Sequence, residues 1–136
     1  MDTSEPAPLR VLVVEDYPDT RRTLRQLLRS WGHDVREAAD GPEALAVAAA
    51  FCPEVALVDL ALPGLDGLEV ARRLQDPGQS PRPLLVALTA LTDPAHVRAA
   101  LAAGFDHFLA KPCEPAQVEF LLRAVRRARR EMAALA

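Results

Sequence analysis

The sequence predicts an α/β protein in which five parallel strands form one doubly wound sheet. Short runs rich in Val and Leu alternate along the chain with longer segments whose apolar residues recur every three to four positions. Most of these short runs are apolar at nearly every position, as strands are when helices cover both faces of their sheet. Because crossovers between parallel strands are right-handed, five strand–helix pairs of this kind give a (βα)5 sandwich.

The first strand is expected at residues 9–16, a Val-rich run that closes on two acids. A helix follows over 18–32, with Pro18 suited to its first turn and Gly32 suited to its end. Residues 33–39 alternate polar and apolar side chains, which places this second strand near an edge of the sheet. The inward stripe of the helix has the i, i+3, i+4, i+7 spacing: Leu24, Leu27, Leu28 and Trp31.

The middle of the chain continues the alternation. A helix over 40–51 begins at the capping residue Asp40. The run "EVALVD" at 54–59 is the third strand, and 67–75 is a helix that a Pro- and Gly-containing segment follows. The fourth strand is expected at 83–90, again an almost wholly apolar run.

The last third of the chain completes the pattern. A helix is expected over 92–104, with Thr92 or Asp93 as its N-cap. Residues 106–110 are a brief fifth strand, and the final helix spans 114–132. Four apolar residues of that helix are expected to face inward: Val118, Leu121, Leu122 and Val125.

Composition excludes several classes of protein. The 136 residues suffice for one core, and the net charge of −3 argues against a nucleic-acid-binding module. No apolar run approaches the roughly 18–20 residues of a membrane span, and the polar, acidic start is unlike a signal peptide. We therefore expect a cytoplasmic protein with one domain at 9–131, a disordered tail at 1–8 and a short C-terminal tail at 132–136.

Cysteine and histidine give no metal or redox motif. Cys52 and Cys113 lie far apart in the sequence and are expected to be free thiols, and Cys113 gains interest only from its closeness to a lysine. His33, His96 and His107 lack the spacing of metal ligands, so we expect them at the surface or at an edge of the sheet.

One lysine stands out among the basic residues. Lys111 is the only Lys, whereas every other basic side chain is Arg. An ammonium is a compact point charge that a planar guanidinium does not replace. The Arg-rich run at 123–130 is expected to be a solvated helix face, with partner binding or dimerisation as the alternative.

Chemically distinctive residues follow four of the five strands. In doubly wound sheets, ligands bind beyond the carboxyl ends of the strands, at the point where strand order reverses. The second strand offers only alanines there. The residues at the other four ends are Glu15 with Asp16, Asp59, Thr89 with Ala90, and Lys111 with Pro112.

This set predicts a metal-assisted phosphoryl site. Three crowded carboxylates repel one another, and a hard divalent cation such as Mg²⁺ relieves that repulsion. A carboxylate beside Mg²⁺ and a lysine is a good nucleophile toward an activated phosphoryl group. The product would be an aspartyl phosphate. Helix capping is the simpler reading of any one of these acids, but it does not account for four strand ends together.

The chain resembles the receiver domain of two-component response regulators. The similarity covers residue 9 to about residue 130 and rests on "VLVVED", "ALVDLALPGLDG", "LLVALTA" and "HFLAKP", in the order and approximate spacing of that family. It implies the flavodoxin-like strand order 2-1-3-4-5. The turn reads Leu62-Pro63-Gly64 where Met-Pro-Gly is common, Glu15 stands for the commoner Asp, and Phe108 stands for a frequent Tyr.

The resemblance also implies a role for each site residue. Asp59 would be the phosphoacceptor, with Asp16 binding Mg²⁺ directly and Glu15 acting largely through water. The backbone carbonyl of Ala61 would complete the protein ligands. Three groups would hold the phosphoryl oxygens: the Thr89 hydroxyl, the Ala90 N–H and Lys111. Pro112, after a cis bond, would aim Lys111, and Thr89 with Phe108 would form the switch.

The implied function is a phosphorylation-activated signalling switch and not an ordinary enzyme. It would take its phosphoryl group from a histidine kinase or a phosphotransfer protein, and would catalyse only its own phosphorylation and dephosphorylation. The output would pass to a protein target through the fourth helix, fifth strand and fifth helix. That face would also serve a weak dimer if the chain is not a monomer, and neither nucleic acid nor membrane is an expected partner.

Three other functions fit the sequence less well. A phosphatase of the haloacid dehalogenase kind needs an acid two residues after its nucleophile, where this chain has Ala61. A receiver-like module that never carries phosphate usually lacks the acceptor or the lysine, and both are present. A flavin-binding protein would need a Gly- and hydroxyl-rich loop after the first strand, where "EDYPDTR" is acidic.

Two positions predict a long-lived phosphorylated state. In the family, the residues two places after the acceptor and two after the threonine tune the lifetime, and here they are Ala61 and Leu91. Neither side chain can donate or accept a hydrogen bond to an attacking water. We therefore expect slow self-dephosphorylation.

Overall fold

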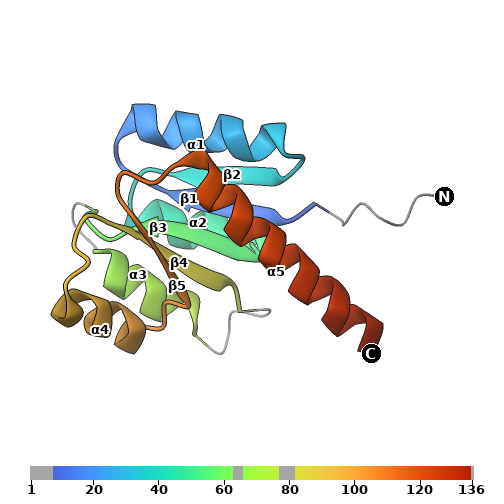
Figure 1. The fold of residues 1–136 in the computed structure, drawn as a ribbon. Coiled ribbons are helices and arrows are strands. Elements are labelled where there is room, and N and C mark those ends of the chain that lie inside the picture. Colours follow the sequence, from blue (N-terminus) through green and yellow to red (C-terminus); the bar gives the residue numbers. More distant parts are fainter. Residues whose placement is uncertain (1–7, 63–65, 77–81, 136) are drawn as a thin grey trace.

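A computed structural model describes residues 8–62, 66–76 and 82–135 (Figure 1). Five strands and five helices alternate strictly along the chain. The strands are β1 (Arg10–Val14), β2 (Asp34–Ala38), β3 (Val55–Asp59), β4 (Leu84–Thr89) and β5 (His107–Ala110). The helices are α1 (Pro18–Ser30), α2 (Gly41–Phe51), α3 (Gly67–Leu74), α4 (Pro94–Ala103) and α5 (Pro115–Leu135).

All five strands are parallel and lie in the order β2-β1-β3-β4-β5, which confirms the predicted topology. The strand order therefore reverses between β1 and β3, the two neighbouring strands at whose ends the acidic residues lie. The alternating strand β2 lies at an edge, as its pattern predicts. β3 is buried at all five positions, as expected of a central strand.

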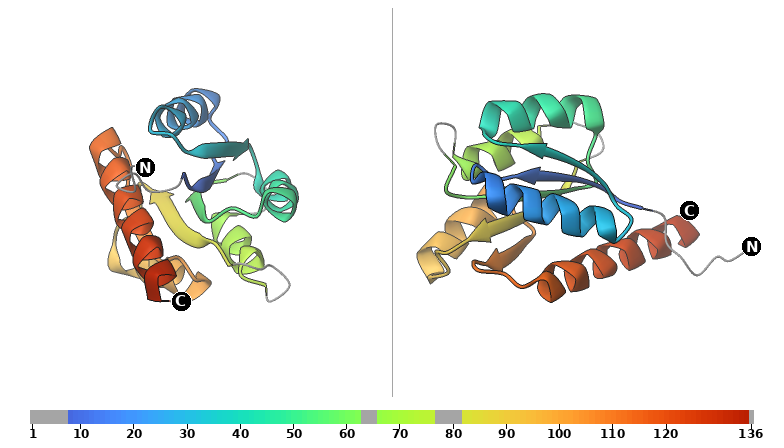
Figure 2. Two further views of the ribbon diagram at one scale, coloured as in Figure 1. Left: turned by 90° about the vertical axis from the view of Figure 1, so that its right-hand side faces the viewer. Right: turned by 90° about the horizontal axis from the view of Figure 1, so that it is seen from above.

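Helices cover both faces of the sheet (Figures 1 and 2). On one face α1 and α5 pack against the strands, with Leu28 and Leu122 among the residues that are fully buried there. On the other face α2, α3 and α4 bury small side chains such as Ala44, Ala71 and Ala100. Each face has its own apolar core, and the sheet separates the two.

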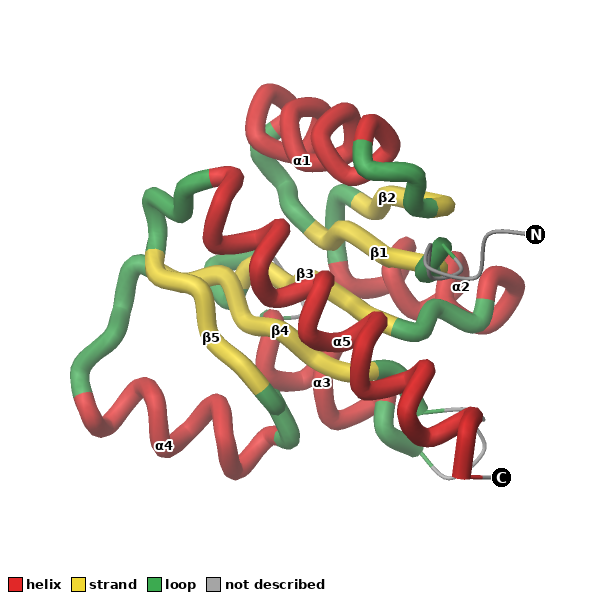
Figure 3. The backbone as a smooth tube through the Cα atoms, turned by 45° about the vertical axis from the view of Figure 1, so that its right-hand side comes forward, coloured by secondary structure: helices red, strands yellow, loops and turns green. Residues whose placement is uncertain are grey.

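The ends of two elements differ from the prediction. β1 ends at Val14, so Glu15 and Asp16 follow the strand instead of closing it and belong to the turn before α1. α5 runs to Leu135, so residues 132–135 continue the helix instead of forming a separate tail. The Ala- and Arg-rich sequence at this end favours helix even though its last side chains are exposed. The tube view in Figure 3 follows α5 from β5 to the C-terminus.

Some expectations lie outside the described residues. These are the disordered tail, apart from Pro8, and the Pro63-Gly64 part of the turn after β3. Most of the segment between α3 and β4 lies outside them as well. Within the described ranges, no helix has the length and apolar character needed to cross a bilayer.

Candidate functional site

The predicted residues meet at the carboxyl edge of the sheet around the Lys111 ammonium. Lys111 Nζ donates to Asp59 Oδ2 and to Glu15 Oε1, each at 2.8 Å. These three residues come from the ends of β5, β3 and β1, which the sheet order brings together although up to 96 positions separate them in sequence. This geometry explains why the apolar strand β3 can end in a buried carboxylate. Asp59 is only 4 % exposed, but the Lys111 ammonium is its direct cationic partner.

Asp16 completes an acidic cluster with these two carboxylates. One carboxylate oxygen each from Glu15, Asp16 and Asp59 lie within 4.8 Å of one another. Asp16 is exposed, whereas Glu15 is 1 % exposed, so the cluster opens to solvent on the Asp16 side. Oxygen donors of this hardness, with room for waters, fit Mg²⁺ better than they fit softer metals.

The pKa values of the two buried acids, Glu15 and Asp59, shift in opposite directions. Burial and the neighbouring Asp59 raise the pKa of Glu15 to about 7, against the opposing effect of Lys111. Burial also disfavours the charge on Asp59, but hydrogen bonds with Glu15, Lys111 and the Ala61 N–H outweigh it and lower the pKa of Asp59. Burial likewise opposes the Lys111 charge, and the two carboxylates nevertheless raise its pKa. Asp59 is therefore the ionised acid of the pair, as a nucleophile must be.

Two further groups line the approach to Asp59. The Ala61 N–H donates to Asp59 Oδ1 at 2.9 Å, which orients the carboxylate. Thr89 is buried, and its hydroxyl oxygen accepts the N–H of Leu91 at 2.9 Å, within the loop that follows β4. Thr89 thus lies at the predicted strand end but bonds to its own loop here, and Ala90 is exposed beside it.

The turn after β5 has the predicted form. The peptide bond between Lys111 and Pro112 is cis, as expected. The Lys111 N–H donates to the Thr89 carbonyl at 2.8 Å, which continues the pairing of β5 with β4 up to the lysine. Phe108 is half-buried and packs beside the core under α2, α3 and α4. Its role as a switch stays a prediction.

Sequence reasoning missed two residues that shape the site. The Arg21 guanidinium donates to the carbonyl of Glu15 at 3.0 Å and to that of Asp16 at 3.4 Å, so it holds the acidic turn from α1. Gly67 lies where a Cβ would meet the Asp59 carbonyl oxygen at 2.7 Å, which lets α3 begin directly against the end of β3. The arginine has no signal in sequence, whereas "DG" before a helix is a weak one.

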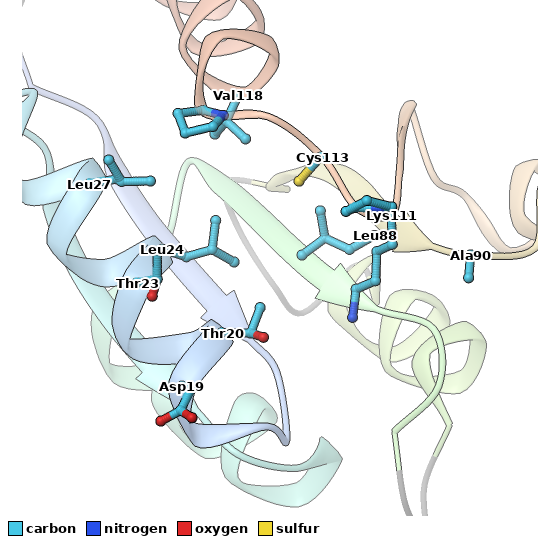
Figure 4. Close-up of a pocket in the computed structure, with 12 residues that line it drawn as sticks. Asp19, Thr20, Thr23, Leu24, Leu27, Leu88, Ala90, Lys111, Cys113 and Val118 are labelled. Carbon is cyan, nitrogen blue, oxygen red and sulfur yellow. The ribbon is translucent and has the colours of Figure 1, made fainter.

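An apolar cavity of about 610 Å³ adjoins the other side of Lys111, between α1 and the start of α5 (Figure 4). In Figure 4 the Lys111 side chain reaches past this cavity toward the end of β3. Cys113 lines the cavity, and burial raises the pKa of its thiol above the ordinary value. Both cysteines are free, as predicted, and Cys113 is a neutral thiol with no activated character.

The expectation that all three histidines are at the surface or at a sheet edge needs one correction. His33 is only 6 % exposed, although it precedes the edge strand β2, and its Nδ1 accepts the Leu9 N–H at 3.2 Å. Burial and the nearby Arg126 lower its pKa, so the ring is neutral. The backbone donor of Leu9 accounts for its burial, and sequence carries no sign of that contact. His96 and His107 are exposed, as expected.

Comparison with known proteins gives a consistent family. The family model for the response regulator receiver domain matches residues 11–123. The chain is 40 % identical over 120 residues to the response regulator MprA of Mycolicibacterium vanbaalenii, which covers 88 % of this chain and 51 % of that protein. It is 36 % identical over 115 residues to the DNA-binding response regulator MtrA of Mycolicibacterium smegmatis, covering 85 % and 49 %. The chain thus spans about half the length of these curated relatives.

Solved structures agree with the sequence relatives. The chemotaxis protein CheY4 of Vibrio cholerae superposes with a TM-score of 0.79 at 31 % identity, covering 89 % of this chain and 98 % of that one. The receiver domain of the sensor histidine kinase PA1611 from Pseudomonas aeruginosa, described with a magnesium ion in its active-site cleft, gives 0.78 at 32 % identity, covering 87 % and 97 %. With the strand order, the acidic cluster and its lysine already in place, the chain belongs to the response regulator receiver domains of two-component systems.

Proposed function

We propose that this receiver domain accepts a phosphoryl group on Asp59 in a Mg²⁺-dependent reaction. The donor would be a histidine kinase or a histidine phosphotransfer protein. The domain would catalyse only its own phosphorylation and dephosphorylation, as a switch and not as an enzyme with an external product.

One observation carries the proposal: Lys111 Nζ lies 2.8 Å from the ionised Asp59 and 2.8 Å from the buried Glu15. A lysine between two buried acids serves two purposes. It neutralises Asp59 while the site is empty, and it can turn to a phosphoryl oxygen once Asp59 carries the group. A merely structural ion pair would not need the third acid, Asp16, at the open side of the site.

Four groups would hold the metal. Asp16 and Asp59 would bind Mg²⁺ directly, Glu15 would act largely through water, and the Ala61 carbonyl would complete the protein ligands. When bound, Mg²⁺ neutralises the charge that develops on the phosphoryl oxygens. The protein's own part is to keep Asp59 ionised and to aim it with the Ala61 N–H.

The phosphoryl oxygens would be bound by Thr89, Ala90 and Lys111. To do so, the Thr89 hydroxyl must give up the Leu91 carbonyl oxygen, to which it now donates at 3.3 Å. Release of that bond would loosen the loop before α4. Phe108, half-buried on the neighbouring strand, would then move inward into the space the hydroxyl vacates.

The output would leave through α4, β5 and α5. This face carries exposed apolar side chains, among them Leu101 and Phe120, the latter 76 % exposed. A shallow hollow of about 390 Å³ between β5 and α5 includes Phe108 and Phe120 in its lining, so the proposed switch residue borders the surface a partner would contact. A protein target or a second copy of the chain would bind there.

Phosphorylation with a small donor tests the proposal. Acetyl phosphate and Mg²⁺ should add one phosphoryl group that hydroxylamine removes, and Asp59→Asn should abolish the modification. Asp66→Asn is the matched control, because Asp66 lines one pocket with Asp59 but caps α3, a role that Asn also fills. Modification of Asp59→Asn at the wild-type rate would show that another residue is the acceptor.

A further inference from the structure

A pocket of about 420 Å³ connects Asp59 with α4. Asp59, Thr89 and Lys111 form one wall, and residues of α3 and α4 form the other. His96, on the first turn of α4, is part of that second wall. His96 and the acceptor Asp59 therefore line one and the same pocket.

Hydrolysis of an aspartyl phosphate needs a water aligned opposite the bond to Asp59 and a group that takes its proton. The flanking residues Ala61 and Leu91 cannot serve, because their side chains neither donate nor accept hydrogen bonds. Thr89 and Lys111 would be bound to phosphoryl oxygens. Of the described residues that line the pocket, His96 carries the side chain suited to exchanging protons near neutral pH.

A carboxylate fixes the orientation of this imidazole. Asp93, the N-cap of α4, contacts His96 Nδ1 with Oδ1 and accepts the His96 backbone N–H with Oδ2 at 3.4 Å. The hydrogen bond from His96 keeps the pKa of Asp93 below its ordinary value, so Asp93 is an ionised acceptor. Nδ1 therefore carries the proton of this hydrogen bond, and in the neutral form of the ring Nε2 has the free lone pair.

We propose that His96 is the general base that sets the lifetime of the phosphorylated domain, with Asp93 as its positioning residue. Water oxygen attacks phosphorus, the bond between phosphorus and the Asp59 oxygen breaks, and the water proton passes to His96 Nε2. Asp59 is restored as a carboxylate, inorganic phosphate leaves, and His96 later returns the proton to solvent. The proposal rests on the proposed function of Asp59.

The experiment follows the loss of phosphate from protein loaded with acetyl phosphate and freed of donor, in Mg²⁺ buffer. His96→Gln keeps a polar group at the third position of the helix, so the N-cap is preserved. It should slow the decay by about a hundredfold or more, the low end of what a general base contributes. His107→Gln, an exposed histidine of β5 outside the pocket, should decay like the wild type.

One further readout separates chemistry from structure. Added imidazole should restore part of the decay rate in His96→Ala, because a free base can enter the space that the missing side chain leaves. A purely structural role of His96 would not be rescued in this way.

The outcomes are distinct. Wild-type protein that takes no phosphoryl group on Asp59 would overturn the proposed function and this inference together. Normal loading with equal decay in wild type and His96→Gln would overturn the role of His96 alone and reduce its contact with Asp93 to helix capping. Asp93→Asn, which keeps the cap but removes the charge, should slow the decay severalfold, and decay equal to wild type would remove Asp93 from the mechanism.

Discussion

The amino ends of the parallel strands form one edge of the sheet and their carboxyl ends form the opposite edge, and these two edges differ in how their charges are held. At the amino edge, Glu54 accepts the Arg10 N–H at 2.9 Å and pairs with the Arg10 and Arg129 guanidinium groups at 3.7 and 3.4 Å. At the carboxyl edge, the Lys111 ammonium pairs with Glu15 and Asp59, two members of a cluster of three acids. The group around Glu54 thus has more cations than acids, whereas the cluster around Lys111 has more acids than cations.

Burial decides what each excess does. The side chains of Arg10 and Arg129 are 42 % and 40 % exposed, so water solvates their surplus charge at little cost. Glu15 and Asp59 are buried, and water cannot solvate them in the same way. The group around Glu54 therefore has a structural role, whereas the acids at the carboxyl edge leave negative charge that a bound cation would neutralise.

The largest effect is expected from the acid at the open side of the cluster. Asp16→Ala should weaken Mg²⁺ binding by more than about a hundredfold, because even residues outside the ligand shell cost 10- to 100-fold. Calorimetric or NMR titration measures it, with modest wild-type affinity expected from so few protein ligands. Asp19→Ala, an exposed acid in the first turn of α1, is the control. Equal Mg²⁺ affinity of Asp16→Ala and wild type would show that the metal does not bind at the carboxyl edge.

The next largest effect is expected from the buried acid Glu15, on the free energy of unfolding. The pKa of Glu15 is raised from 4.5 to about 7 in the folded state, so the folded protein binds more protons than the unfolded chain between these values. This extra proton binding by Glu15 adds to the free energy of unfolding in full below about pH 4.5, and the gain is lost as pH rises through 7. Glu15→Gln avoids that loss and should have a free energy of unfolding about 2–3 kcal/mol above wild type at pH 8.

Urea unfolding in EDTA at pH 8 and pH 4 measures this difference, and the gap should close at pH 4, where Glu15 is neutral in both states. A gap that is equal at both pH values would mean that packing, and not the charge of Glu15, limits stability. Asp34→Asn, an exposed acid of β2, is a control far from the cluster.

Sequence predicted most of the fold and the place of the site for a physical reason. Parallel strands bring their carboxyl ends to one edge, so the acids after β1 and β3 and the lysine after β5 had to approach one another. What it missed depends on contacts between distant elements. Burial of His33 depends on the Leu9 N–H, and the place of His96 in the pocket depends on how α4 packs. Neither leaves a periodic or compositional signal.

The apolar flanks of the carboxyl edge give a smaller effect, on the rate of dephosphorylation. Ala61 and Leu91 are both exposed, Leu91 by 54 %, so polar replacements there reach water without repacking the core. Ala61→Asn with Leu91→Glu should speed the decay of phosphorylated protein about ten- to a hundredfold, or roughly 1.4–3 kcal/mol in the barrier, because the new groups can orient an attacking water. Decay at the wild-type rate or slower would show that these positions do not control the lifetime.

The smallest effect is expected at the amino edge, and it decides whether the two edges are independent. Glu54→Gln keeps an oxygen for the Arg10 N–H but removes the charge that meets two arginines. Because those arginines are partly solvated, the free energy of unfolding should fall by only about 1 kcal/mol, and less in high salt. Phosphorylation of Asp59 and its decay should not change, because the sheet separates Glu54 from the site by the length of β3. Urea unfolding and acetyl phosphate labelling of the same preparation measure both properties. A lower free energy of unfolding with unchanged labelling would show that the charge of Glu54 serves stability alone. Altered labelling would show that this charge, at the start of β3, also affects Asp59 at its end.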